Sequence, residues 1–323
     1  MRALTALFVA AMLAACSSSD APLGGGGTGS ARGSGAGGGG GTPGTPEGGA
    51  LTSAVLGLVT FEDRPGGAAA AVSTNVVSAR FLEGAYGDAD AGAGALVLPA
   101  GCTERTVSVA DTTCRRIDCP QIVSTEPVGV ERSAGRLTLG GLTGADLIDP
   151  TPSGTYTPLT STEVPFWQGG ASLDVSAAGD VVPAFTATVT AVPALTLVEP
   201  VDTGDGTRNL SRSVGLSLRL GETVQTLRLT LAFSVALDGG AQRIAFDCSA
   251  PGTSGTLTVP AELVLDLPDD SAPVSGELVG EISTSVPLGP TDAPVGRAIV
   301  AARRIVTAAD QSALDWKRFV LIP

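Results

Sequence analysis

The sequence predicts an all-β body that follows a disordered Gly-rich linker. Apolar and polar residues alternate over many short stretches, and Gly, Pro, Asp and Ser separate these stretches about every 8–12 residues. Long windows of helical periodicity are nearly absent. Such alternation is typical of antiparallel sheets with one buried and one wet face. We therefore expect two antiparallel β-sandwich domains, immunoglobulin-like or jelly-roll-like, at residues 51–199 and 200–323.

The first fifteen residues resemble a secretory signal. Met1-Arg2 supplies a short positive region, and the run Ala3 to Ala15 is apolar except for Thr5. This run is too short to span a hydrocarbon core of about 30 Å, which needs about 20 residues, but it fits the apolar region of a signal peptide.

The end of this run, Leu13-Ala14-Ala15-Cys16, is followed by Ser17 and resembles the lipobox of bacterial lipoproteins. The resemblance implies a diacylglyceryl thioether on Cys16, cleavage between Ala15 and Cys16, and acylation of the new amino terminus. Such acyl chains hold a protein on a lipid bilayer. In this family, Ser after the cysteine favours the outer membrane. An ordinary secretory signal with an incidental cysteine is the alternative.

Residues 16–50 are expected to form a disordered tether. Between Gly24 and Gly49, 15 of 26 residues are Gly, and no apolar periodicity is present to offset the entropy of ordering them. As a Gly-rich coil, the tether reaches about 30–35 Å. The whole layout is similar to Gly-linkered envelope lipoproteins of Gram-negative bacteria, a resemblance that implies no particular activity.

In the body, the clearest strand is predicted at residues 227–237, where six apolar residues alternate with mostly polar ones. Similar alternation covers residues 213–220 and 185–190. Residues 296–309 also fit a helical stripe, but their β-branched content favours a strand. A domain boundary is expected near Glu199-Pro200, where strands give way to the turn-rich segment 202–206.

The cysteines restrict the architecture. With Cys16 acylated, Cys102, Cys114, Cys119 and Cys248 remain, and an oxidising compartment would pair them in two disulfides. Three connectivities are open, and each of them joins Cys248 to the first half of the chain. One alternative leaves Cys248 as a buried thiol, and another uses Cys114 and Cys119 as metal ligands.

Several classes of activity are disfavoured by composition. The chain has no His, so imidazole-based nucleophiles and metal ligands are excluded, and its one lysine, Lys317, makes Schiff-base chemistry improbable. A formal charge of −13 without a basic block argues against nucleic acid as a partner. We expect no enzyme activity and no cofactor other than a weakly indicated Ca²⁺.

The Ca²⁺ candidates are two turns that place carboxylates near Gly. Asp88 and Asp90 lie in one turn, and Asp202 and Asp205 lie in the other. Neither turn has the spacing of an EF-hand, so ordinary solvated turn carboxylates are the alternative.

Two hypotheses follow for function. The first is a membrane-anchored lipoprotein of the cell envelope, periplasmic or surface-facing, with a non-enzymatic structural, display or binding role toward an envelope glycan or protein. The second is a carbohydrate-binding protein or a carboxylate-dependent polysaccharide hydrolase of the envelope. Phe166-Trp167 would supply the rings that stack on a sugar, although a core position for Trp167 is the simpler interpretation.

Overall fold

The structure is a computed structural model of the chain. It describes residues 54–64, 74–84, 101–109, 111–119, 129–144, 146–161, 165–204, 207–237, 240–267, 273–308 and 314–322. All of these belong to one compact unit. The predicted signal at residues 1–15, the tether at 16–50 and the candidate Ca²⁺ ligands Asp88, Asp90 and Asp205 lie outside the described residues.

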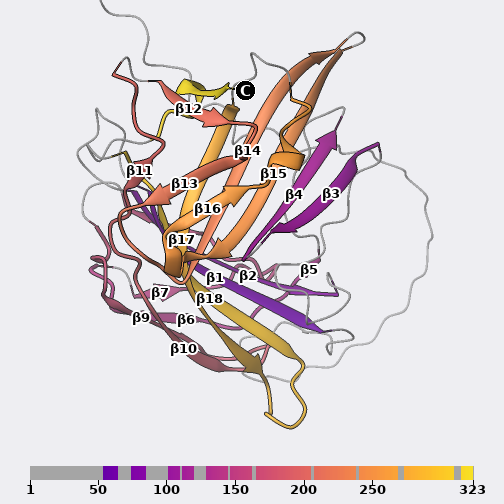
Figure 1. Cartoon of the computed structure of the whole chain (residues 1–323). Helices are drawn as coiled ribbons and strands as arrows, with labels where there is room; N and C mark the ends of the chain where they lie inside the picture. Colours follow the sequence, from indigo (N-terminus) through magenta and orange to yellow (C-terminus); the bar gives the residue numbers. More distant parts are fainter. Residues whose placement is uncertain are drawn as a thin grey trace, which may run out of the picture. The chain divides into compact units, whose positions relative to one another are not determined.

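The described body is mostly β-strand, which confirms the predicted class. A ten-stranded sheet dominates it (Figure 1). In spatial order its path is β3 (Thr103–Val109), β4 (Thr112–Cys119), β15 (Gly240–Pro251), β14 (Thr226–Leu237), β17 (Pro273–Leu288), β18 (Gly296–Ile305), β1 (Val55–Arg64), β2 (Thr74–Glu83) and β5 (Val130–Glu131), with β8 (Leu159–Ser161) also paired to β2.

Three smaller sheets complete the described strands. Their orders are β10 (Phe185–Thr190), β9 (Ser172–Ala177), β6 (Leu137–Gly140) and β7 (Leu147–Ile148); β11 (Leu197–Glu199), β13 (Leu216–Leu220) and β16 (Thr256–Val259); and β12 (Arg208–Ser211) with β19 (Phe319–Ile322). The short 3-10 helices are η1 (Gly252–Ser254), η2 (Ala261–Leu263) and η3 (Trp316–Arg318). In the part of the chain that the structure describes, no helix is long and apolar enough to cross a membrane.

The strongest alternating segments form strands as predicted. Strands β14 and β10 cover the predicted segments, and β13 starts at Leu216, beyond Val214, which is 70% exposed. Residues 296–305 form strand β18. The strand predicted from the β-branched content of this segment is therefore confirmed, and the alternative of a helix is wrong.

The sheets are mixed, whereas antiparallel sheets were expected. Strand β1 pairs with β18 in parallel, and β12 pairs with β19 in parallel. The alternation of buried and wet side chains reports only that one face of a strand is covered, and a parallel pair inside a mixed sheet satisfies it equally well.

The predicted division between residues 199 and 200 does not separate two sandwiches. The ten-stranded sheet takes strands from both sides of that division, since β15 pairs with β4 and β18 pairs with β1. These pairings are long-range, and a turn-rich segment in the sequence does not reveal them.

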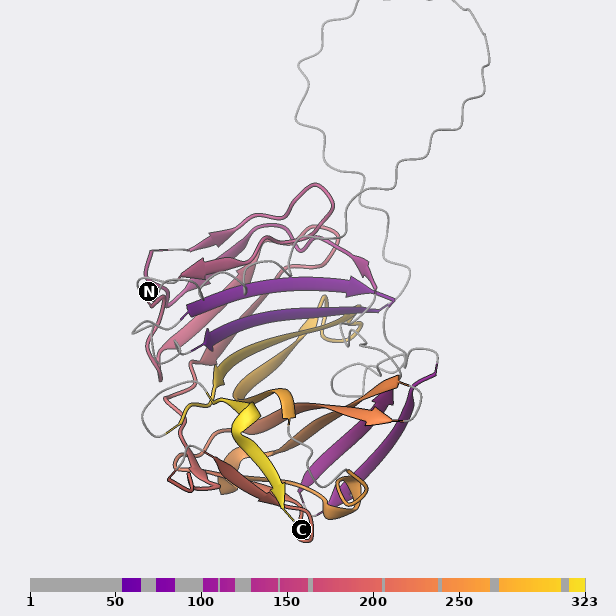
Figure 2. The same ribbon diagram turned by 90° about the horizontal axis from the view of Figure 1, so that it is seen from above.

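The smaller sheets cover the large sheet and bury its inner side chains. Near β1 and β2, Phe61 packs edge-on against Trp167 at 5.7 Å, and Phe81 lies 5.8 Å from Phe185 of β10. Figure 2 shows the magenta-to-pink strands of this region beside the indigo strands β1 and β2. At the other end, β16 lies against β14, β15 and β4.

Gly57 in β1 has a clear packing role. A Cβ atom at this position would lie 2.8 Å from two carbons of the Phe81 ring, which is closer than van der Waals contact allows. Phe81 is fully buried and directly opposite Gly57 in the register of β1 and β2. The missing side chain therefore gives the Phe81 ring its place in the core.

A buried carboxylate at the end of β1 has its partners beside it. Asp63 is 6% exposed, accepts a hydrogen bond from Asn75 Nδ2 at 3.1 Å, and lies 2.8 Å from Arg304 Nη1. Asn75 Oδ1 in turn accepts the backbone N–H of Phe166 at 2.7 Å. A buried charge needs such partners, and these ones join β1, β2 and β18.

Candidate functional site

Two cross-strand disulfides lie in the β3–β4–β15 part of the large sheet. Cys102 pairs with Cys119 and closes the β3–β4 hairpin, and Cys114 pairs with Cys248 across β4 and β15. Cys114 and Cys248 are fully buried. The prediction that Cys248 joins the first half of the chain is confirmed, and neither Cys114 nor Cys119 is available as a metal ligand.

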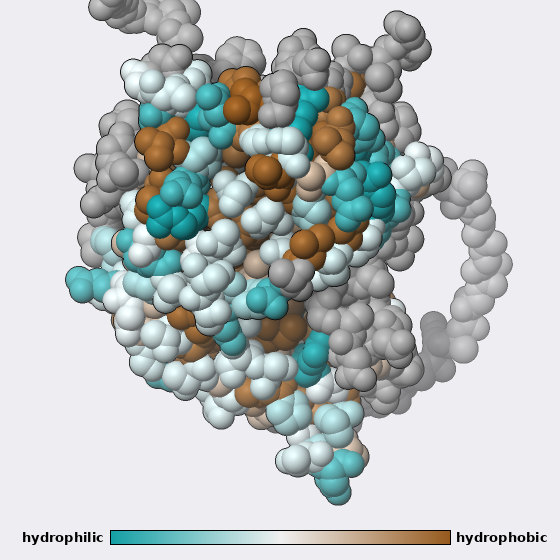
Figure 3. Space-filling model, in the orientation of Figure 1, coloured by the Kyte–Doolittle hydropathy of each residue, from teal (hydrophilic) through white to brown (hydrophobic). Residues whose placement is uncertain are grey.

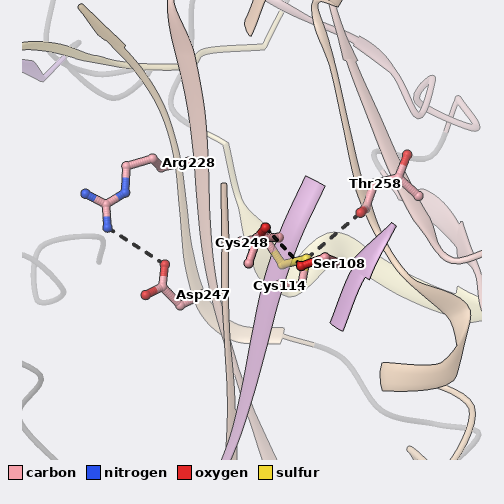
Figure 4. The surroundings of a disulfide bond; sticks show 7 residues. Ser108, Cys114, Arg228, Asp247, Cys248 and Thr258 are labelled. Carbon is pink, nitrogen blue, oxygen red and sulfur yellow. Dashed lines mark hydrogen bonds and ion pairs between the residues drawn. A yellow bond between two sulfur atoms is a disulfide. The ribbon is translucent and has the colours of Figure 1, made fainter. Parts of the chain in front are cut away.

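A groove of about 530 Å³ opens beside this buried disulfide. One wall comes from the tip of the β3–β4 hairpin, with Val109 and Asp111, and the opposite wall comes from β16 and η2, with Thr256, Thr258 and Glu262. Figure 4 shows Thr258 on one side of the disulfide and the Arg228–Asp247 pair on the other.

Strand β16 turns an unpaired edge toward the groove. Leu220 N–H donates to Gly255 O at 2.7 Å, so the pairs two residues further along, including Leu218 with Leu257, are also hydrogen-bonded pairs. The intervening residues Thr256 and Thr258 therefore point their N–H and C=O groups away from β13. No described strand pairs with this outer edge.

Contacts of the two threonines agree with this orientation. Ser254 Oγ lies 3.3 Å from Thr256 N and 3.4 Å from Thr256 O, and Thr258 O lies 3.9 Å from Cys114 Sγ. A disulfide sulfur carries no proton, so the last distance is a van der Waals contact. The side-chain hydroxyl of Ser254 thus makes only long bonds to the edge, which a better partner can replace.

Two arginines join the β3–β4 hairpin to η2, beside the groove. Arg105 of β3 donates to the carbonyl of Glu262, and Arg116 of β4 donates to Leu263 O at 2.9 Å. Arg116 also pairs with Asp118 at 3.0 Å and with Asp266. Burial opposes the charge of Arg116, but the hydrogen bonds and attraction of the two aspartates raise its pKa above the ordinary value. These bonds hold η2 against the hairpin.

A second hollow, of about 350 Å³, lies on the opposite face of the large sheet. Glu277 of β17 and Asp247 of β15 contribute carboxyl groups to it, with Thr230 of β14 between them. Burial raises the pKa of Glu277, and Arg64, 3.7 Å away, opposes that shift. Asp247 has Arg115 at 3.4 Å and Arg228 at 4.0 Å.

This pair suits catalysis poorly. Two inter-strand spacings, about 10 Å, separate the backbones of Asp247 and Glu277. A general base must present an unencumbered carboxylate, whereas each oxygen of Asp247 faces an arginine.

The predicted stacking rings are in the core. Trp167 is 7% exposed and packs against Phe61, and Trp316 is 6% exposed and stacks on Phe319 at 4.6 Å. Phe166 is partly buried against the same core. Trp167 therefore has no exposed face for a sugar ring, and its simpler interpretation as a core residue agrees with the structure.

Of the four candidate Ca²⁺ ligands, the structure describes Asp202. Its Oδ1 accepts the backbone N–H of Gly204 at 2.8 Å, an ordinary local bond of a turn aspartate. Within the described ranges, no group of three or more Asp, Glu, Cys or His side chains is placed to hold a metal ion.

The groove and the Glu277 hollow were both missed from the sequence. Each is made by strands that pair across long stretches of chain, so no local motif marks it. In the sequence, Val109 and Val214 stand out only as apolar residues next to turn residues. In the structure they are 52% and 70% exposed.

Comparisons with known proteins add little. No family model matches the chain, and no curated protein matches it. Among solved structures, it is similar to the mu-homology domain of yeast delta-COP-I, with 8% identity over 79% of this chain and 98% of that one. The TM-score of 0.16 is too low to support any argument from this likeness.

Proposed function

We propose that this protein is a lipoprotein of the cell envelope, anchored through acylated Cys16, whose disulfide-bonded β-body has a non-enzymatic display or binding role. The observation that carries the proposal is the use of the cysteines. The chain has five, and the two disulfides of the body use four of them. The fifth is Cys16, in the lipobox-like segment.

The disulfides also bear on the compartment. Disulfides persist in secreted and periplasmic proteins and are rare in the cytosol, where thiols are kept reduced. A leader that directs export and a body that contains two disulfides therefore agree with each other. On the outer membrane, the Gly-rich tether would place the body about 30–35 Å from the lipid surface.

A binding role is favoured over catalysis by the side chains available. With no His in the chain, acid–base catalysis would depend on carboxylates, and the described pair Asp247 and Glu277 is poorly arranged for it. Figure 3 shows apolar side chains as separate patches between polar ones on the face in view. Such a surface suits a tethered body that remains in water.

Replacement of the anchoring cysteine tests the proposal. The Cys16→Ser variant should leave the membrane fraction, whereas the Ser17→Ala variant, which keeps the cysteine, should stay there. Thiol labelling under denaturing, non-reducing conditions should find no free thiol in the mature protein and one, on Cys16, in the precursor before the thioether forms. Unchanged membrane partition of Cys16→Ser would refute the anchor.

The hydrolase alternative has its own test. Purified protein would be assayed on peptidoglycan and common polysaccharides beside the Glu277→Gln variant. Turnover that disappears in this variant would replace the binding role with a catalytic one.

A further inference from the structure

We propose that the groove beside β16 binds an extended peptide segment of another protein, with alternating apolar and basic residues, by addition of a strand to the β16 edge. This inference concerns the body alone and does not depend on the lipid anchor.

The backbone of β16 supplies the first part of the argument. Thr256 and Thr258 direct their N–H and C=O groups away from β13, since the hydrogen-bonded pairs with β13 are those of Leu257 and its alternate neighbours, and both residues line the groove. Unpaired edges of this kind accept an extended segment through main-chain hydrogen bonds. An incoming strand would form hydrogen bonds with the N–H and C=O groups of Thr256 and Thr258, which β13 does not use.

The side chains around the edge supply the second part. Val109 and Val214, 52% and 70% exposed, are apolar lining residues of the groove. The carboxylates of Asp111 and Glu262 line the same groove, and no Lys or Arg is among its described lining residues. Valines and carboxylates line the groove together, so a bound strand that carries both apolar and basic side chains matches both kinds of group.

The groove is also held at a fixed width. Cys114 of the buried disulfide contacts Thr258 O at 3.9 Å, and the bonds from Arg105 to Glu262 O and from Arg116 to Leu263 O tie η2 to the hairpin. A site that needs no rearrangement loses less conformational entropy when a peptide binds. The free edge is therefore preorganised for an added strand.

A second copy of this chain is a poor occupant. The chain carries a formal charge of −13, and the two groove carboxylates would face an equally acidic neighbour. Like charges across an interface oppose association. A basic segment of another protein gains attraction at the same position.

The experiment measures binding of a fluorescent peptide of alternating valine and arginine to the full mature chain in detergent. We expect saturable binding that falls at least about tenfold when alternate peptide nitrogens are methylated, because N-methylation blocks strand pairing and leaves the charge unchanged. A peptide of alternating valine and glutamate should not bind. Equal affinity for the methylated peptide would overturn the proposal.

Variants locate the site. The double variant Asp111→Asn/Glu262→Gln should weaken binding about fivefold to tenfold, since two exposed ion pairs are lost. Asp149→Asn is the matched control, because its carboxylate is 61% exposed and pairs with Arg136 elsewhere on the body. An equal loss in the control would overturn the proposal.

A further variant tests the edge itself. Thr258→Pro should abolish binding, since the outward N–H is removed while the bonds to β13 remain. Circular dichroism shows whether this variant is folded. If it is not folded, the comparison of the methylated and unmethylated peptides on the wild type tests whether the peptide binds by strand pairing. Sedimentation of the wild type gives the last outcome: a dimer that Thr258→Pro dissociates, together with no peptide binding, would identify a second copy as the occupant and refute the proposal.

Discussion

Cys114 and Cys248 lie directly opposite each other on the neighbouring strands β4 and β15, although 134 positions separate them in the chain. Their bond is buried inside the large sheet, and Cys114 Sγ lies 3.9 Å from Thr258 O of β16. It therefore links the first and second halves of the chain inside one sheet.

Loss of this disulfide should destabilise the body more than loss of the other one. The Cys114→Ala/Cys248→Ala variant opens a loop of 134 positions, which the chain-entropy model values at about 5 kcal/mol. The matched Cys102→Ala/Cys119→Ala variant opens a loop of 17 positions, valued at about 3 kcal/mol. Urea unfolding of both variants measures the two losses.

The order of the two losses is the decisive result. A Cys102–Cys119 variant that loses as much stability as the Cys114–Cys248 variant would contradict the assignment of the long-range link. Wild type unfolded in reductant should lose more stability than either variant.

The half-buried carboxyl of Glu277, whose side chain is 37% exposed, should contribute less to stability as pH rises above the ordinary Glu value. Burial raises its folded pKa above the ordinary value of 4.5, so between these two values the folded state binds more protons than the unfolded state. The contribution of Glu277 to the free energy of unfolding therefore decreases with pH across this window and is constant above it. Glu277→Gln should remove this slope, and its stability relative to wild type should be highest at neutral pH.

Glu199 supplies a control of opposite sign. A hydrogen bond from Arg219, at 2.7 Å, lowers the pKa of this exposed carboxyl. Glu199→Gln should therefore lose stability relative to wild type at neutral pH, and the difference should disappear as pH falls through the folded pKa. Urea unfolding over a pH series measures both variants, and slopes of the same sign would contradict the assignment.

Tyr156 should be costly to replace by phenylalanine. Its hydroxyl donates to Gly135 O and accepts the N–H of Ala134, both at 2.8 Å. Tyr156→Phe leaves that N–H, on a fully buried residue, without its partner, which costs about 1–3 kcal/mol. Thermal unfolding of the variant measures the loss.

The same residue has a spectroscopic signature. Burial raises the pKa of Tyr156 above the ordinary value of 10.0. The chain has two tyrosines, so one should ionise late in an alkaline absorbance titration. Tyr156→Phe should remove this late step and Tyr86→Phe should keep it; the reverse pattern would contradict the assignment.

Much of the fold was predictable because strand formation is locally encoded. The alternation along residues 227–235 marks which side chains of β14 are buried, and the β-branched residues of 296–305 identify β18 as a strand. Ile244, Phe246 and Cys248 alternate with polar or small residues, a pattern that places all three on one face, and all three are buried.

The candidate site was not predictable. Thr256 and Thr258 are unremarkable in the sequence, and they become an edge only because β16 pairs with β13 on one side. A core position was the simpler interpretation of Trp167 and agrees with the structure, but its partner there, Phe61, lies more than a hundred positions earlier and could not be named from the sequence.

The sequence by itself determined the β class, the strands within residues 185–190, 213–220, 227–237 and 296–309, and the link from Cys248 to the first half of the chain if all four body cysteines pair, because alternation, turn residues and cysteine number are local or countable. Only the tertiary structure decided that Cys114 is the partner of Cys248, that β1 and β18 run parallel, and that one sheet spans both halves. These features depend on contacts between residues as distant as Val55 and Gly296. The order of strands in a sheet depends on the packing of the whole core, which no local pattern contains.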